Sequence, residues 1–168
     1  MPAWPFSSGW RPRRGAVCRR PAPLKSRRPS SFVHWPPGAF SSPRAPVVIG
    51  IIGRDPFGTK IDRISKSFNA NGREVEVRRL RSARSAAACH ILFVAADQLD
   101  NMTAITKALA GRPVLLVSDQ EEFLARGGMI NFITLGSKIR FDINLAASRD
   151  CGLQISSKLL KIAHRVVK

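Results

Sequence analysis

The stretch CHILFVAADQLDNMTAITKALAGRPVLLVSD, residues 89–119, indicates the fold class of this chain. Its two ends, residues 89–96 and 112–119, are short apolar runs of the kind that form buried strands. The residues between them read as a helix that begins with Asp97 as its N-cap and stops at Gly111. A strand, a helix and a strand in this order predict two parallel strands joined by a crossover.

The same alternation extends toward the N-terminus. Residues 46–53, PVVIGIIG, predict another buried strand, and residues 59–68 place apolar side chains at helical spacing. Gly72 is the expected left-handed stop of that helix. Residues 73–80, REVEVRRL, alternate valine with charged residues, which predicts a half-exposed strand at the edge of a sheet.

The C-terminal part predicts a hairpin followed by a helix. Two apolar runs, MINFITL and KIRFDINL, flank Gly136-Ser137, which is typical of a β-hairpin. Residues 146–167 predict a closing helix that is interrupted near Cys151-Gly152, with Asn144 as a candidate cap. The whole pattern predicts an α/β fold: a single Rossmann-like domain whose mostly parallel sheet is flanked by helices, with a C-terminal β-hairpin and helix.

The net charge of +17 is spread unevenly over the 168 residues. Residues 1–46 carry nine Lys/Arg and no acidic residue, whereas residues 47–168 carry nineteen basic against eleven acidic residues. We expect residues 1–30 to be a disordered, Arg/Pro-rich basic leader and residues 31–168 to be the folded domain. Such a leader could bind nucleic acid or anionic lipid, but no aromatic–basic repeat accompanies it, so nucleic acid is not the expected partner.

Export signals and redox sites are not evident. The chain has no apolar run long enough to span a bilayer and no apolar core of a secretory signal peptide, so as written it reads as soluble and not exported. The three cysteines, Cys18, Cys89 and Cys151, form no CxxC pair, which argues against zinc and thioredoxin-like sites. Cys89 is expected in the core, and a Cys89–Cys151 disulfide stays open.

The first strand–helix turn, GIIGRDPFG at residues 50–58, is where an open α/β sheet usually binds phosphate. It matches neither GxGxxG nor GxxxxGK[ST], and Pro56 removes a backbone donor. A response-regulator receiver could recruit Asp55 and Asp97, but its acidic pair and distal lysine are not evident. Nucleotide or small-ligand binding is therefore the alternative interpretation and not the leading one.

No catalytic constellation stands out. The histidines His34, His90 and His164 are scattered, and no Ser-His-Asp, Cys-His or HExxH arrangement occurs. Asp142 and Asn144 lie on one face of a predicted strand, where a structural role is the simpler interpretation. We expect neither an enzyme nor a cofactor or metal site.

An ordered set of motifs resembles the YfiR family of small periplasmic α/β proteins. The motifs are GxxGxDPFG, NGREVEVRRL, CHILFVA, GRPVLLVSD, FLARGGMINF, KIRFDINL and GLQISSKLLKIA, and SFVHWPPGAF at residues 31–40 resembles the segment before that family's first strand. The resemblance covers about residues 31–168. Upstream of Phe32 and Trp35 the family's signal peptide and apolar helix are replaced by Arg/Pro-rich sequence, and our hypothesis is a wrong translation start or a frameshift.

The resemblance implies a non-enzymatic negative regulator in the periplasm. Family members bind the periplasmic sensor domain of an inner-membrane diguanylate cyclase and hold it inactive, which lowers cyclic-di-GMP, exopolysaccharide and biofilm formation. An outer-membrane, peptidoglycan-associated lipoprotein can sequester the repressor. The family offers no catalytic residues to carry over. Two cysteines in the matching region exclude a two-disulfide arrangement.

A regulator that works by contact needs an exposed surface. We expect an apolar contact patch on the hairpin and the last helix, although for any single member packing against the sheet is the simpler interpretation. An edge strand and an apolar face would also allow a homodimer. The candidate contact residues are Phe141, Leu145, Leu153, Ile155 and Leu159.

Overall fold

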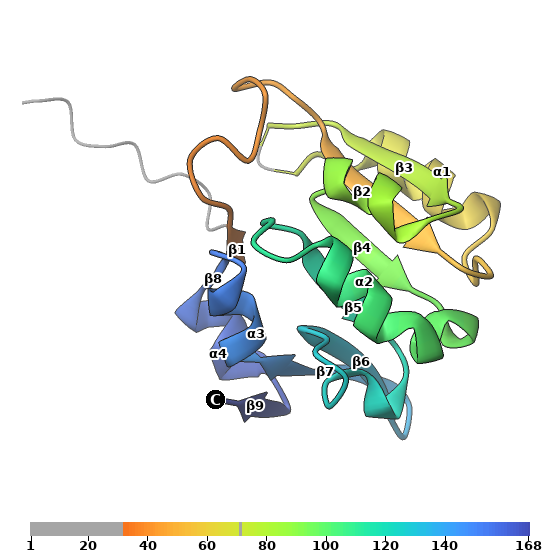
Figure 1. Ribbon diagram of the computed structural model, residues 1–168, viewed down its shortest axis with the longest axis vertical. Helices are drawn as coiled ribbons and strands as arrows, with labels where there is room; N and C mark the ends of the chain where they lie inside the picture. The colour runs from red at the N-terminus through yellow and green to blue at the C-terminus, as the bar shows by residue number, and fades with distance from the viewer. Residues whose placement is uncertain (1–31, 71) are drawn as a thin grey trace, which may run out of the picture.

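The computed structural model describes residues 32–70 and 72–168, drawn in colour in Figure 1. The expected leader, residues 1–30, lies outside the described residues, so its disorder stays a prediction. Within the described ranges, no helix is both long and apolar enough to cross a membrane.

One seven-stranded sheet forms the centre of the fold, in the order β3-β2-β4-β5-β6-β7-β9. All neighbouring pairs are parallel except β6 and β7, which form the antiparallel hairpin. A two-stranded antiparallel sheet, β1 with β8, lies beside it. The strands are β1 Val33–His34, β2 Val47–Ile52, β3 Val75–Leu80, β4 Ile91–Val94, β5 Leu115–Ser118, β6 Ile130–Leu135, β7 Lys138–Asn144, β8 Gln154–Ile155 and β9 Arg165–Val167.

Helices cover both faces of the large sheet. In Figure 1, α1 lies behind β2 and β3, whereas α2 lies in front of β4 and β5. The fold class predicted from the sequence is therefore confirmed, including the hairpin and the helical C-terminal region. The α-helices are α1 Thr59–Ser67, α2 Met102–Ala108, α3 Leu145–Asp150 and α4 Ser157–Ile162, and the 3-10 helices are η1 Ala83–Ala88, η2 Ala96–Asn101 and η3 Glu121–Phe123.

Buried apolar side chains from the central strands and the surrounding helices form one core. Parallel strands covered on both faces are apolar along their whole length, which explains why these strands could be predicted from the sequence. Strand β3 alternates between half-buried and exposed residues and occupies the sheet edge, as its sequence predicted. Cys89 is buried in the core, as expected, and both Cys89 and Cys151 are free thiols.

The predicted N-cap role of Asp97 is wrong. The segment after β4 begins as the 3-10 helix η2, and its N-cap is Ala95, which makes no side-chain capping hydrogen bond. The Asp97 carboxylate instead accepts a hydrogen bond from the backbone N–H of Arg54, which lies in the loop after β2. The Asp97 carboxylate therefore bonds a neighbouring loop instead of capping the helix that follows it in the sequence.

The C-terminal region is not a single interrupted helix. The interruption at Cys151-Gly152 is real, since Gly152 adopts a φ of 73°, but it separates α3 from the short strand β8. Helix α4 then ends at Ile162, and β9 pairs in parallel with β7. The β-branched Val166 and Val167 suit an added edge strand better than a last helical turn. Asn144 does cap α3, because its Oδ1 accepts from the N–H of Ala147 at 3.1 Å.

Candidate protein-contact surface

The loops after β2 and β4 meet at the point where an open α/β sheet usually binds its ligand. Their backbone donors are already used by side chains of the same loops. The N–H of Arg54 donates to Asp97 at 2.9 Å, and the N–H groups of Phe57 and Gly58 donate to Asp55 Oδ1 at 2.7 and 3.2 Å. These donors are therefore not presented to a phosphate group.

Packing closes the same place. The ring of Phe57 lies edge-on to Phe93 of β4, with the ring centroids 4.7 Å apart. Arg79 of β3 bonds both Asp55 and Asp62 of α1, and its hydrogen bonds lower the pKa of the Asp62 carboxyl. The loop is held as a structural turn, which removes the geometric basis of the nucleotide-binding alternative.

The hairpin β6–β7 presents two different faces. Cross-strand partners Phe132 and Phe141 share one face with Ile139, and the pair Leu135 and Lys138 lies on the other. The outer half of the hairpin is poorly covered, because the side chain of Ile139 is 74% exposed and that of Leu135 is 47% exposed. Large apolar side chains therefore reach solvent at this edge of the sheet.

An open hollow of about 550 Å³ lies between the hairpin and the end of α4. Cationic side chains dominate its lining, and no carboxylate belongs to it. Two exposed aliphatic residues, Leu135 and Ile162, lie among these cations. The lining residues are Leu135, Lys138, Arg140, Lys161, Ile162, Ala163 and His164.

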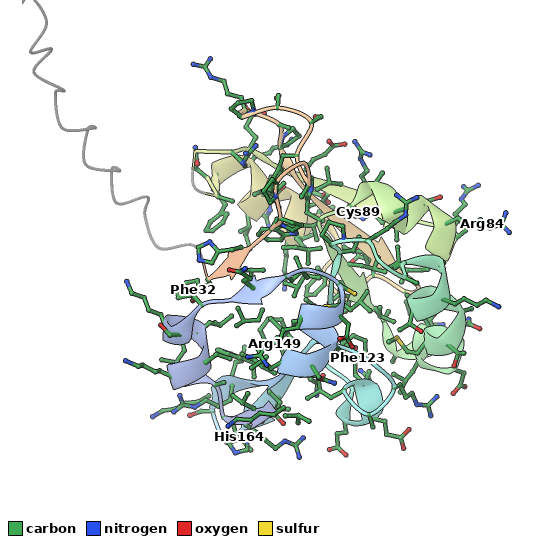
Figure 2. The ribbon with its side chains drawn as sticks, turned by 60° about the vertical axis from the view of Figure 1, so that its left-hand side comes forward. Phe32, Arg84, Cys89, Phe123, Arg149 and His164 are labelled. Atoms are coloured by element: carbon green, nitrogen blue, oxygen red, sulfur yellow. The ribbon has the colours of Figure 1, made fainter. Side chains whose placement is uncertain are left out.

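A buried carboxylate fixes the geometry of this hollow. Asp142 of β7 accepts from Arg165 Nη2 at 2.9 Å, and its other oxygen lies 3.0 Å from His164 Nδ1. The backbone N–H of His164 also donates to the carbonyl of Phe141 at 2.9 Å. These contacts hold the link between α4 and β9 against the hairpin, at the lower end of the molecule where Figure 2 labels His164.

The structure places the five candidate contact residues toward the core. Leu153 is 1% exposed and Leu145 is 8% exposed, so neither is available to a partner in this conformation. Phe141, Ile155 and Leu159 are partly buried and pack against the same core cluster. Because the chain turns at Gly152, the spacing of a single helix does not describe their faces.

Sequence reasoning missed the apolar residues that do reach solvent on these elements. The available signal was local: Leu135 and Ile139 flank the Gly136-Ser137 turn, where a hairpin extends beyond its sheet neighbours. The sequence predicted a helix that continued to residue 167, so it did not indicate that α4 would end at Ile162 and place this residue near Leu135. The exposed apolar residues of the hairpin, α4 and β9 are Phe132, Leu135, Ile139, Ile162 and Val167.

Comparison with known proteins agrees with this architecture. A family model described as YfiR/HmsC-like matches residues 28–164. Among solved structures, a conserved domain protein from Vibrio cholerae is similar, with a TM-score of 0.50 and 10% sequence identity. The match covers 71% of this chain and 54% of the other, so this chain spans about half the length of that protein. At this identity the likeness concerns the fold alone.

Proposed function

Since the chain belongs to the YfiR/HmsC-like family, we propose that it binds the periplasmic sensor domain of an inner-membrane diguanylate cyclase and inhibits the enzyme. Members of this family are periplasmic regulators of cyclic-di-GMP signalling rather than catalysts. Inhibition of a cyclase would lower cyclic-di-GMP and, with it, exopolysaccharide output and biofilm formation.

The observation that supports this proposal best is the uncovered edge formed by the hairpin, α4 and β9. Its aliphatic side chains contact solvent, and its cations surround a hollow. At the usual ligand position of the sheet, by contrast, backbone N–H groups already donate to Asp55 and Asp97. An exposed apolar area rimmed by charge is typical of a protein-interaction site. A protein with this distribution is suited to work by contact.

Two further partners belong to the proposal. An outer-membrane, peptidoglycan-associated lipoprotein would sequester the regulator and release the cyclase. The outer edge of β3 has no strand beside it among the described residues, and it offers a surface for a homodimer. Both partners would be met in the periplasm, where the family acts.

The test is intracellular cyclic-di-GMP in the native host with and without the gene. Deletion should raise the level several-fold, and a plasmid copy should restore it. The purified domain should also bind the purified sensor domain of a cyclase whose own deletion cancels the rise. An unchanged level, in cells where the protein is detected in the periplasmic fraction, would contradict the proposal.

A further inference from the structure

We infer that the hollow between the hairpin β6–β7 and the end of α4 binds an acidic segment of a partner protein, and that this segment inserts an apolar side chain. The inference rests on the proposed function, because it names the chemistry by which the regulator recognises its partner. Four features of the hollow lead to it: unpaired cations, exposed aliphatic side chains, a fixed frame and the exclusion of the chain's own leader.

Three cations, Lys138, Arg140 and Lys161, line the hollow. In residues 32–70 and 72–168, no carboxylate lies within ion-pair distance of Lys138, Arg140 or Lys161. Some other arginines of the domain do have a carboxylate partner, as Arg79 and Arg126 have. Like charges gathered in one concave place raise the local potential and attract an anionic ligand.

The aliphatic residues of the hollow indicate more than a bare anion. Leu135 contributes from the hairpin, and Ile162, which is 53% exposed, contributes from α4. Covering such side chains removes apolar area from water and so favours a complex. A segment that combines carboxylates with one apolar side chain would satisfy both kinds of lining residue.

The frame around the hollow is fixed before any partner arrives. Asp142 contacts both His164 and Arg165, and these contacts join β7 to the link between α4 and β9. Both oxygens of this buried carboxylate are already paired, Oδ1 with His164 and Oδ2 with Arg165, although Asp142 lies on the same face of β7 as Lys138 and Arg140. A preformed site loses less conformational entropy on binding than a flexible one.

The chain's own leader does not fit this site. Residues 1–30 carry eight Lys/Arg and no acidic residue, so the leader would be repelled by the lining. A lipid surface is flat, whereas the cations here surround a concave space that suits an inserted side chain. An external acidic segment is therefore the occupant that the charges and the shape favour.

A peptide measurement tests the chemistry directly. The probe is a fluorescein-labelled peptide Glu-Glu-Leu-Glu-Leu-Glu, compared with its Gln-Gln-Leu-Gln-Leu-Gln counterpart by fluorescence anisotropy on the full chain. We expect at least tenfold tighter binding of the acidic peptide, with affinity that falls as salt rises. Equal affinity for both peptides, or no binding of either, would overturn the inference.

Matched charge reversals distinguish binding at the hollow from attraction of the peptide by the net charge of the chain. The triple variant K138E/R140E/K161E changes the hollow, and K60E/R63E/K66E makes the same change on exposed residues of α1. Thermal unfolding identifies any variant that fails to fold, and the single reversals K138E and K161E then replace the triple. The hollow variant should lose at least tenfold in peptide affinity, while the α1 variant stays within threefold. Equal losses would mean that net charge alone acts, which overturns the inference.

The same variants in the host distinguish this inference from the proposed function. If the natural chain lowers cyclic-di-GMP and only the hollow variant fails to do so, the inference is supported. If the hollow variant still represses, the inference is wrong although the function stands. If the natural chain does not repress, the proposed function fails, and the peptide measurement still decides the chemistry of the hollow.

A membrane surface and a second copy of this chain are the two other possible occupants of the hollow, and each would give a different result. Binding to phosphatidylglycerol vesicles that is lost in the hollow variant, without peptide binding, would assign the hollow to a membrane surface. Self-association in sedimentation that is lost in the hollow variant, again without peptide binding, would assign it to a second copy of this chain. Either result would overturn the inference.

Discussion

The Oδ1 atom of Asp97 accepts a hydrogen bond from the backbone N–H of Arg54 at 2.9 Å, and this contact joins the loops after β2 and β4. It is the main cause of the lowered pKa of the Asp97 carboxyl. In nucleotide-binding sheets the same position stays open, so that backbone donors can reach a phosphate. In this sheet the carboxylates of Asp55 and Asp97 instead accept from the backbone donors of the loop after β2.

The loop junction depends on Gly53. This residue has a φ of 92°, and a Cβ built there would contact Asp97 Oδ1 and approach Gln98 Cγ at 2.7 Å. Gly53→Ala would combine an unfavourable backbone conformation with a steric clash, and we expect it to lower the free energy of unfolding by about 3 kcal/mol. Urea denaturation followed by circular dichroism measures this change.

Gly136 provides the matched control for Gly53. It also has a positive φ, 61°, but a Cβ there would have nothing within 4 Å. Gly136→Ala should cost only about 1 kcal/mol, the backbone contribution alone. If the two variants lose equal stability, crowding by Asp97 is not what makes Gly53 necessary.

Alanine substitutions test whether Leu153 is buried and Ile139 is exposed, as the structure shows. Leu153 is fully buried, so Leu153→Ala should lower the free energy of unfolding by about 2–5 kcal/mol through lost burial and a cavity. Ile139 lies in solvent, and Ile139→Ala should change stability by less than about 0.5 kcal/mol. Both values come from the same denaturation experiment. A large loss at Ile139 would show that the hairpin face is covered in solution.

The central strands were predictable because strand burial requires a continuous run of apolar residues in the sequence. A parallel strand covered on both faces is apolar throughout, as in residues 46–53 and 89–96. The hairpin was predictable from its turn, because Gly136-Ser137 separates two strand-forming runs. The role of Asp97 was not predictable, because its partner Arg54 is distant in sequence and approaches only in the folded sheet.

The burial of Leu145 and Leu153 was not predictable for a related reason. The sequence pattern places Leu153, Ile155 and Leu159 on one apolar helical face after Gly152, but Ile155 belongs to the strand β8 and Leu153 turns into the core. Apolar side chains look alike in sequence whether they are covered or not. Exposure at Leu135 and Ile162 depends on which elements end nearby, and this is a property of the assembled sheet.

The two described cysteines should differ in reactivity. Cys89 is buried among core residues, and desolvation raises the pKa of its thiol. Cys151 is only partly buried, although burial raises its pKa as well. Because the accessible thiolate is the reactive species, maleimide should label Cys151 at least tenfold faster than Cys89. Mass spectrometry of single-cysteine variants, with Cys18→Ser in all of them, measures the two rates; equal rates would contradict the burial of Cys89.

His90 connects the segment before β2, which contains Ala39 and Phe40, to the sheet. The ring of His90 stacks on Phe40 with centroids 4.2 Å apart, and Arg73 lies over the other side of Phe40 at 3.9 Å. His90 Nδ1 accepts from the N–H of Val48 at 3.0 Å, so Nε2 carries the proton and donates to the carbonyl of Ala39 at 3.1 Å. The neutral ring is thus the form that fits both bonds.

Acid should therefore weaken the fold through His90. Burial lowers its pKa, and the positive charge of Arg73 lowers it further. A histidine with a lowered folded pKa contributes stability that is complete above its usual pKa of about 6.5 and is lost as the pH falls below that value. We expect the free energy of unfolding to decrease from pH 7 to pH 5, and to decrease less in His90→Asn, whose amide oxygen can still accept from Val48. The exposed His34→Asn is the matched control and should follow the natural chain; if His90→Asn follows it as well, protonation of His90 does not govern the acid sensitivity.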